Sequence, residues 1–245
     1  MTKFSVNLNK FALLRNSRGH NNPDVLAIAQ RCVTRGVHGL TVHPRPDERH
    51  TRFADVAALA AFVKTQSGVE FNVEGYPTPA FLELVLTTKP DQCTLVPDEP
   101  GQLTSDHGWD AVAKAEQIKD AVRTLQRGGV RVSVFLDPVL AQVEAVKATG
   151  TDRIELYTEP YARAFGQRGQ AAELARFAAA AKHAMALGIG VNAGHDLNQA
   201  NLGSFLDAVP GVLEVSIGHA VVCESFDHGL EATLDAYLAI VNARA

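Results

Sequence analysis

The sequence predicts a closed (β/α)8 barrel, a ring of eight parallel strands with helices outside it. Three observations favour this fold class. Short runs rich in β-branched residues recur eight times, and a helical pattern follows each of them. The 245 residues divide into units of about 31, which is the length of one strand with its crossover helix. Eight such units fit a closed barrel better than an open doubly wound sheet, which usually has fewer strands.

The predicted strands each end in a polar or glycine-containing step. Their strict alternation with helices indicates that they run parallel, because each helix returns the chain to the same edge of the sheet. The predicted strands are residues 4–9, 39–43, 69–74, 92–96, 131–137, 152–157, 189–192 and 213–217.

The predicted helices carry their own start and stop signals. In the first, Asn22 is placed to cap the helix, Pro23 to occupy its first turn, and Gly36 to end it. Two further apolar stripes at helical spacing end before Gly128 and Gly188. Each stripe is expected to pack against the sheet. No linker or low-complexity tract divides the chain, so one domain over residues 1–245 is expected, with a longer polar loop at 98–108.

The composition favours small molecules as the binding partners of this protein. The chain has 23 Lys+Arg against 27 Asp+Glu, a net charge of −4, and this balance disfavours nucleic acid and membrane surfaces as partners. Its 3 cysteines show no CxxC spacing, which favours a reducing compartment, most simply the cytoplasm. The first residues lack the apolar region of a signal peptide, and no run of about 18 apolar residues is present to span a bilayer.

Chemically versatile residues gather at the predicted strand ends. In this fold the loops after the strands form the active-site mouth, so these side chains are expected to converge there. A single one of them can equally be a solvated edge residue. They are Asn7, Asn9, His43, Glu74, Thr94, Asp137, Glu155, Asn192, His195, Gly218 and His219.

Two carboxylates, Glu74 and Glu155, emerge from apolar strands. Burial raises the pKa of a carboxyl toward the range of a general acid or base. The alternative is a structural ion pair with Arg or Lys, because a buried charge needs a partner.

Two regions are candidate phosphate sites. Arg45 follows the second strand in a loop rich in charges, and its guanidinium can grip phosphate with two hydrogen bonds; a solvated charged turn is the alternative. The seventh and eighth strands end in the small-residue segments 190–195 and 216–220, where barrels commonly hold phosphate on backbone N–H groups. His195 and His219 lie in these segments.

Short motifs in fixed order give the chain a resemblance to the pyridoxine 5′-phosphate synthase family. The motifs are VNLNK at 6–10, LRNSRG at 14–19, TVHPR at 41–45, NVE at 72–74, LVP at 95–97, VNAGH at 191–195 and IGHA at 217–220. They run from residue 6 to residue 220, which is nearly the whole chain.

The resemblance implies a reaction. A barrel without metal or organic cofactor condenses 3-amino-2-oxopropyl phosphate with 1-deoxy-D-xylulose 5-phosphate and releases phosphate and water. It also implies roles: His43 and Glu74 as general bases, His195 as proton donor, and Glu155 as the group that stabilises charge in the transition state. The implied substrate-binding residues are Asn7, Gly218 and His219 for the aminoketone phosphate, Arg45, His50 and Thr104 for the deoxyxylulose phosphate, and Arg18 to close over the ligand.

This chain departs from the family's pattern at two places. The family often has Asp-His where this chain has Asn9-Lys10, and Gly where this chain has Asp196. Both changes alter charge next to a substrate, so all three residues are counted with the substrate-binding set. We expect the positive charge of Lys10 to offset the negative charge of Asp196. Two interpretations of these departures remain open: the chain belongs to a subgroup that catalyses the same reaction, or its substrate preference is altered.

Two other functions stay open on the sequence. A metal-dependent sugar-phosphate isomerase or epimerase could use His43, Glu74, Glu155 and His195 as ligands, although no HxH or ExxH pair is present. A non-catalytic barrel that binds phosphate ligands would bind without turnover. The resemblance also implies a homo-oligomer, an octamer built from dimers.

Overall fold

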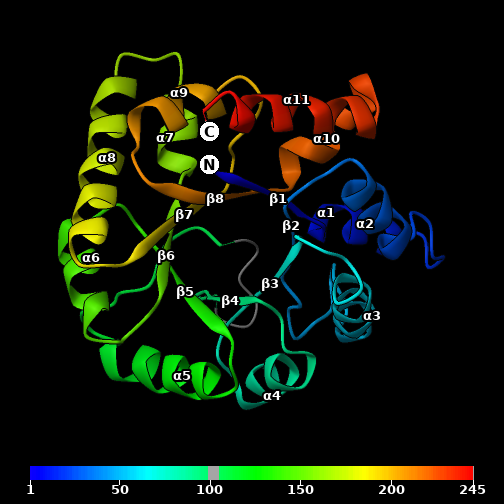
Figure 1. The fold of residues 1–245 in the computed structure, drawn as a ribbon, viewed down its shortest axis with the longest axis horizontal. Coiled ribbons are helices and arrows are strands. Elements are labelled where there is room, and N and C mark those ends of the chain that lie inside the picture. The colour runs from blue at the N-terminus through cyan, green and yellow to red at the C-terminus, as the bar shows by residue number, and fades with distance from the viewer. Residues whose placement is uncertain (99–104, 245) are drawn as a thin grey trace.

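Eight parallel strands close into a barrel in the computed structural model, which describes residues 1–98 and 105–244. Each strand pairs with the next in the chain, and β8 pairs back with β1 (Figure 1). The predicted fold class is therefore confirmed. The strands are β1 Lys3–Asn7, β2 Gly39–Val42, β3 Glu70–Gly75, β4 Gln92–Leu95, β5 Arg131–Leu136, β6 Arg153–Tyr157, β7 Gly190–Gly194 and β8 Val212–Ile217.

The strand ends differ from the predicted ones by one or two residues. β1 stops at Asn7, two residues before the predicted end, because helix α1 begins at Asn9, where the sequence patterns predicted no helix. β7 continues two residues beyond the predicted end, since Ala193 and Gly194 still pair with Leu156 and Tyr157 of β6. Small residues carry little strand preference of their own, so tertiary pairing decides this end.

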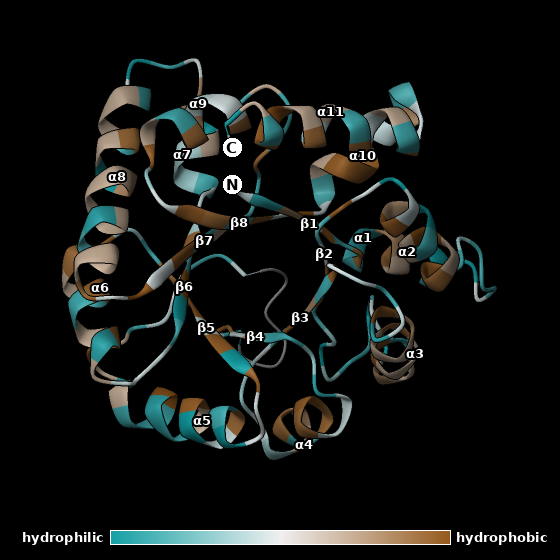
Figure 2. Ribbon diagram, viewed as in Figure 1, coloured by the Kyte–Doolittle hydropathy of each residue, from teal (hydrophilic) through white to brown (hydrophobic). Residues whose placement is uncertain are grey.

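Helices surround the ring of strands (Figure 1). The helix at residues 115–127 buries the apolar residues Ile118, Val122 and Leu125, and brown and teal residues alternate along its ribbon in Figure 2. Within the described residues, no helix is both long and apolar enough to cross a membrane. The helices are α1 Asn9–Asn16, α2 Val25–Thr34, α3 Phe53–Val63, α4 Pro79–Thr88, α5 Ala115–Arg127, α6 Leu140–Lys147, α7 Glu159–Ala164, α8 Gln170–Ala186, α9 Leu202–Ala208, α10 His219–His228 and α11 Leu230–Asn242.

The predicted start of α2 is wrong. Asp24, not Asn22, caps the helix, and its carboxylate accepts hydrogen bonds from the backbone N–H groups of Leu26 and Ala27. Pro23 precedes the cap and so lies outside the first turn. An aspartate satisfies two of the unpaired N–H groups at a helix start, and its charge also suits the positive end of the helix dipole.

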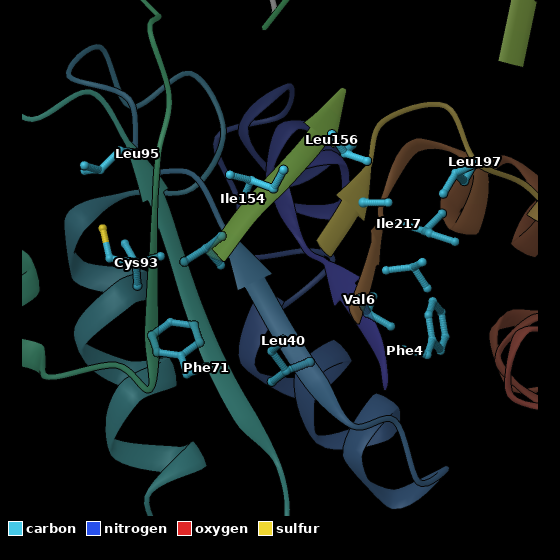
Figure 3. Packing of buried hydrophobic residues seen from close by; sticks show 14 of the residues in the cluster. Phe4, Val6, Leu40, Phe71, Cys93, Leu95, Ile154, Leu156, Leu197 and Ile217 are labelled. Atoms are coloured by element: carbon cyan, nitrogen blue, oxygen red, sulfur yellow. The ribbon is translucent and has the colours of Figure 1, made fainter. Parts of the chain in front are cut away.

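The main apolar core fills the layer between strands and helices. Strand residues such as Phe4, Val6, Leu40 and Phe71 are fully or almost fully buried there (Figure 3). The alternate strand residues carry polar groups instead: the hydroxyl groups of Ser5 and Thr41, for example, lie 2.8 Å apart. A polar barrel interior places hydrogen-bonding side chains directly below the mouth.

Candidate active site

The mouth of the barrel brings together the four predicted acid–base residues. His43 follows β2, Glu74 lies near the end of β3, Glu155 is in β6, and His195 follows β7. The charges of the two glutamates influence each other, and so do those of the two histidines. Strand ends far apart in the sequence therefore meet in one site, as predicted.

Both carboxyls are buried without a cationic partner. Glu74 is 8% exposed and accepts a 3.4 Å hydrogen bond from Asn7, and Glu155 is 3% exposed and accepts one of 3.4 Å from Thr94. In the described part of the chain, no Lys or Arg forms a salt bridge with either. The alternative of structural ion pairs is thus not supported.

Burial has a direct effect on the protons of these carboxyls. It raises the pKa of Glu155 to about 8, and the negative charge of Glu214 adds to this. Burial, and then the charge of Glu155, raises the pKa of Glu74 well above its usual range. Burial therefore favours the protonated form of both groups.

The histidines of the mouth are mainly neutral. Burial lowers the pKa of His43 well below its usual value, and the Arg45 cation adds to the effect. Burial also lowers the pKa of His50 to about 4 and that of His195 by a smaller amount, because the charge of Asp196 partly offsets it. Neutral imidazoles beside neutral carboxylic acids can both accept and donate protons.

His195 is held in an uncommon conformation. Its φ is 84°, a region that few residues other than glycine adopt, and its ring packs 5.5 Å from Phe135 and 5.4 Å from Tyr157. The hydroxyl group of Thr158 donates to the carbonyl oxygens of Gly194, at 2.7 Å, and of His195. These contacts compensate the strain and fix the ring at the mouth.

Gly194 is required by the approach of a carboxyl group. A Cβ at this position would lie 2.5 Å from Oε1 of Glu155. Gly218, between β8 and α10, is similar, because its Cβ would lie 2.9 Å from both Cβ and the carbonyl oxygen of Asn7. His219 is the first residue of α10 and is exposed, with Nε2 3.6 Å from Sγ of Cys223.

Arg45 does not lie in a solvated turn. It is 6% exposed and forms a salt bridge with Asp98, which follows β4. His50 is on the same loop, half-buried, with its ring centroid 6.0 Å from that of His43. The structure therefore brings Arg45, His50 and His43 to one side of the mouth. Thr104, predicted to bind the same substrate, lies outside the described residues.

Arg18 is exposed in the segment after α1, and its backbone N–H donates a 3.4 Å hydrogen bond to the carbonyl oxygen of Arg15. Two neighbours in the same motif, Arg15 and Asn16, have side-chain hydrogen bonds to other parts of the chain. Arg15 is 3% exposed, binds Asp55 through both guanidinium nitrogens at 2.6 and 2.8 Å, and donates to the carbonyl oxygen of His50. Asn16 donates to the same carbonyl oxygen at 2.8 Å. Sequence reasoning missed both, although Arg15 follows the apolar Phe11 at helical spacing.

Asn9 has a structural contact that the sequence did not predict. Its side-chain oxygen accepts hydrogen bonds from the backbone N–H of His43 and from the hydroxyl group of Thr51, both at 2.8 Å. Lys10 and Asp196 are exposed and form no salt bridge with each other in the described structure. Their charges act on His195 in opposite directions: Lys10 lowers its pKa and Asp196 raises it.

The donor set of the mouth gives no metal centre. Among residues 1–98 and 105–244, no group of three or more His, Cys, Asp or Glu side chains is arranged to hold a metal ion.

These features define a (β/α)8 barrel with an acid–base site at the carboxyl ends of its strands. The family model described as pyridoxal phosphate biosynthesis protein PdxJ matches residues 4–243, and the chain belongs to this family. The resemblance found in the sequence motifs is confirmed.

Curated relatives agree with the family. The chain is 52% identical over 247 residues to pyridoxine 5′-phosphate synthase of Xanthomonas oryzae pv. oryzae, covering 98% of this chain and 96% of that protein. It is 49% identical over 243 residues to pyridoxine 5′-phosphate synthase of Parabacteroides distasonis, covering 99% of this chain and 100% of that protein.

Solved structures share the fold at low sequence identity. The 3-keto-L-gulonate-6-phosphate decarboxylase of Vibrio cholerae matches with a TM-score of 0.68 and 12% identity, over 99% of this chain and 98% of that one. Phosphoribosyl anthranilate isomerase of Thermotoga maritima matches with a TM-score of 0.64 and 13% identity, over 99% and 100%. At this identity the likeness describes the barrel and not its chemistry.

Proposed function

We propose that the protein is a pyridoxine 5′-phosphate synthase. It condenses 3-amino-2-oxopropyl phosphate with 1-deoxy-D-xylulose 5-phosphate and releases phosphate and water as the pyridine ring closes. The observation that carries the proposal is the mouth itself, where two buried carboxyls of raised pKa lie beside imidazoles of lowered pKa. Imine formation, dehydration and aromatisation each need a proton moved, and such groups supply that near neutral pH.

The acid–base residues have separate roles in this proposal. His43 is neutral and acts as a general base, and Glu74 becomes a base once a positively charged amine or iminium nearby favours its ionised form. His195 first takes up a proton, which the nearby charge of Asp196 favours, and then donates it to a leaving oxygen. Glu155 stabilises positive charge that develops in the transition state, because its carboxyl loses its proton most readily when a cation is close.

The two phosphates are held on different sides of the mouth. Arg45 and His50, with Thr104, contact the deoxyxylulose phosphate. Asn7, Gly218 and His219 hold the aminoketone phosphate, and the adjoining first turn of α10 offers N–H groups that favour an anion.

Four further residues complete the substrate-binding set. Arg18 closes over the bound ligand, and its exposure leaves it free to do so. Asn9, Lys10 and Asp196 border the substrates, where Lys10 and Asp196 offset each other's charge at His195.

The decisive assay incubates purified protein with both phosphorylated substrates and follows the absorbance of the pyridine product. We expect product and inorganic phosphate to form in equal amounts. Folded protein that yields no product would reject the proposed reaction. Activity that disappears after chelation and returns with a metal ion would instead favour the metal-dependent alternative.

The assembly and location of the protein are part of the same proposal. One domain over residues 1–245 assembles in the cytoplasm into a homo-octamer that is built from dimers. Size-exclusion chromatography with light scattering is expected to give a mass of about eight times 26.3 kDa. A monomer in this measurement would remove the oligomer from the proposal and leave the reaction untouched.

A further inference from the structure

Asp98 is a buried carboxylate at the mouth to which neither the motifs nor the proposed roles assign a function. It follows β4, and its side chain is 2% exposed. Leaving a carboxylate in such a place is costly unless its oxygens are paired. The contacts of the Asp98 carboxylate therefore indicate its role.

Among the described residues, the polar contacts of the Asp98 side chain all fall on one oxygen. Oδ2 accepts the guanidinium group of Arg45 and a 2.6 Å hydrogen bond from the hydroxyl group of Ser105, and it lies 4.0 Å from Nδ1 of His43. The other oxygen, Oδ1, is buried without a hydrogen-bond partner in the described part of the chain. A side chain selected for stability alone would not keep an unpaired buried oxygen, because that oxygen pays a desolvation cost with no return.

The position of Arg45 depends on this contact. An arginine side chain has many rotamers, and its planar guanidinium binds phosphate well only in the right orientation. Asp98 lies on the loop after β4, whereas Arg45 lies on the loop after β2, so the salt bridge ties together two loops on the same side of the mouth. The same oxygen lies 4.0 Å from Nδ1 of His43, close to the ring but beyond hydrogen-bond distance.

We propose that Asp98 is a positioning residue that holds the Arg45 guanidinium in place for 1-deoxy-D-xylulose 5-phosphate. This inference rests on the proposed function. It implies that loss of Asp98 weakens the use of one substrate and not of the other, because the aminoketone phosphate is held on the β8 side of the barrel.

The test compares Asp98→Asn with the wild-type protein. We expect the KM for 1-deoxy-D-xylulose 5-phosphate to rise roughly 10- to 100-fold, since a small misplacement of a binding group has effects of this size. The KM for the aminoketone phosphate is expected to stay within about twofold, an effect that corresponds to less than about half a kcal/mol. Equal losses for both substrates, or no loss at all, would overturn the proposal.

The same substitution made in an Arg45→Gln variant distinguishes a positioning role of Asp98 from a general loss of structure. In Arg45→Gln, the carboxylate of Asp98 has lost the group that it positions, so adding Asp98→Asn is expected to raise the same KM only a little further. Fully additive effects would show that Asp98 acts independently of Arg45 and would overturn the proposal.

Two more variants serve as controls. Asp47→Asn removes an exposed salt bridge with Arg49 on the same loop, and we expect little change, because exposed ion pairs contribute little. Asp98→Glu keeps the charge but moves it by one methylene group. Its KM for deoxyxylulose phosphate is expected between those of the wild type and Asp98→Asn, and this variant decides the matter if Asp98→Asn does not fold: an unchanged KM, or equal rises for both substrates, would contradict the positioning role.

The wild-type assay keeps this test apart from the proposed function. If the wild-type protein closes the ring and Asp98→Asn behaves identically, only the proposed role of Asp98 is overturned. If the wild type closes no ring, the proposed reaction fails, and titration calorimetry with 1-deoxy-D-xylulose 5-phosphate alone still decides whether Asp98→Asn weakens binding. Wild-type protein that does not bind this compound overturns both.

Discussion

The two sides of the barrel mouth are built by different means. On the β2 and β4 side, Arg45 and Asp98 are charged side chains buried against each other. On the β7 and β8 side, Gly194 and Gly218 let other groups approach the backbone closely. One side therefore depends on the position of a charge and the other on the absence of a side chain. The comparison teaches that the two proposed phosphate sites can be disturbed separately.

The largest effect is expected between the two sides, where the chemistry occurs. Glu74→Gln keeps the size of the side chain but cannot move a proton. We expect kcat to fall roughly 100- to 10,000-fold, because general acid–base groups contribute this much. The KM values for the two substrates are expected to change little. Steady-state kinetics checks this, and a kcat within tenfold of the wild type would show that Glu74 is not a proton carrier.

A smaller but selective effect is expected on the β8 side. Gly218→Ala places a Cβ 2.9 Å from Asn7, closer than real Cβ atoms come, so the backbone must shift there. Overpacking of this kind costs about 1 to 3 kcal/mol, and we expect the affinity for the aminoketone phosphate to fall roughly tenfold or more. The matched control is Gly169→Ala, where a Cβ meets no atom within 4 Å. If both variants bind equally well, the close approach at Gly218 has no functional importance.

The pH dependence of stability tests the burial of the central carboxyls. The pKa of Glu155 is about 8 in the folded protein, above its value in the unfolded chain, so the folded state holds the proton more tightly. The free energy of unfolding should then decrease as pH rises from the unfolded pKa toward 8. Glu155→Gln removes this loss. In urea unfolding, the free energy of unfolding of Glu155→Gln is expected to rise relative to that of the wild type between pH 5 and pH 9. A difference between the two proteins that does not change with pH would contradict the raised pKa of Glu155.

The smallest expected effect concerns the charges at the edge of the mouth. Lys10 lowers the pKa of His195 and Asp196 raises it. Lys10→Ala should therefore raise this pKa, Asp196→Gly should lower it, and the double variant should titrate near the wild type. NMR titration of the His195 ring measures all three. Shifts in the same direction for both single variants would refute the offset, as would a double-mutant cycle without coupling in substrate affinity.

The fold could be predicted from the sequence because its signals repeat. Eight apolar runs, each followed by a helical stripe, leave few other architectures. The errors lie where one local contact decides the outcome. Asp24 rather than Asn22 caps α2 because both side chains can do so and only the three-dimensional path of the chain selects between them.

The candidate site was predicted where residues end strands, as with His43, Glu74, Glu155 and His195. Side chains whose role depends on a salt bridge with another residue of the chain were not predicted. Asp98 follows β4 in a polar loop and looks like any solvated carboxylate until its contact with Arg45 is seen. The sequence gives no sign that Arg15 is buried, because arginine is mostly exposed, whereas here Asp55 compensates its burial. Pairing between distant residues is information that one sequence does not display.

The separate construction of the two sides is the central claim, and titration calorimetry tests it directly. Each phosphorylated substrate is titrated alone into the wild type, Arg45→Gln and Gly218→Ala. We predict that Arg45→Gln weakens binding of 1-deoxy-D-xylulose 5-phosphate roughly 10- to 100-fold, as loss of a charged hydrogen-bonding group does, and leaves the aminoketone phosphate unaffected. Gly218→Ala should show the reverse. Equal weakening of both substrates in either variant would contradict two independent phosphate sites.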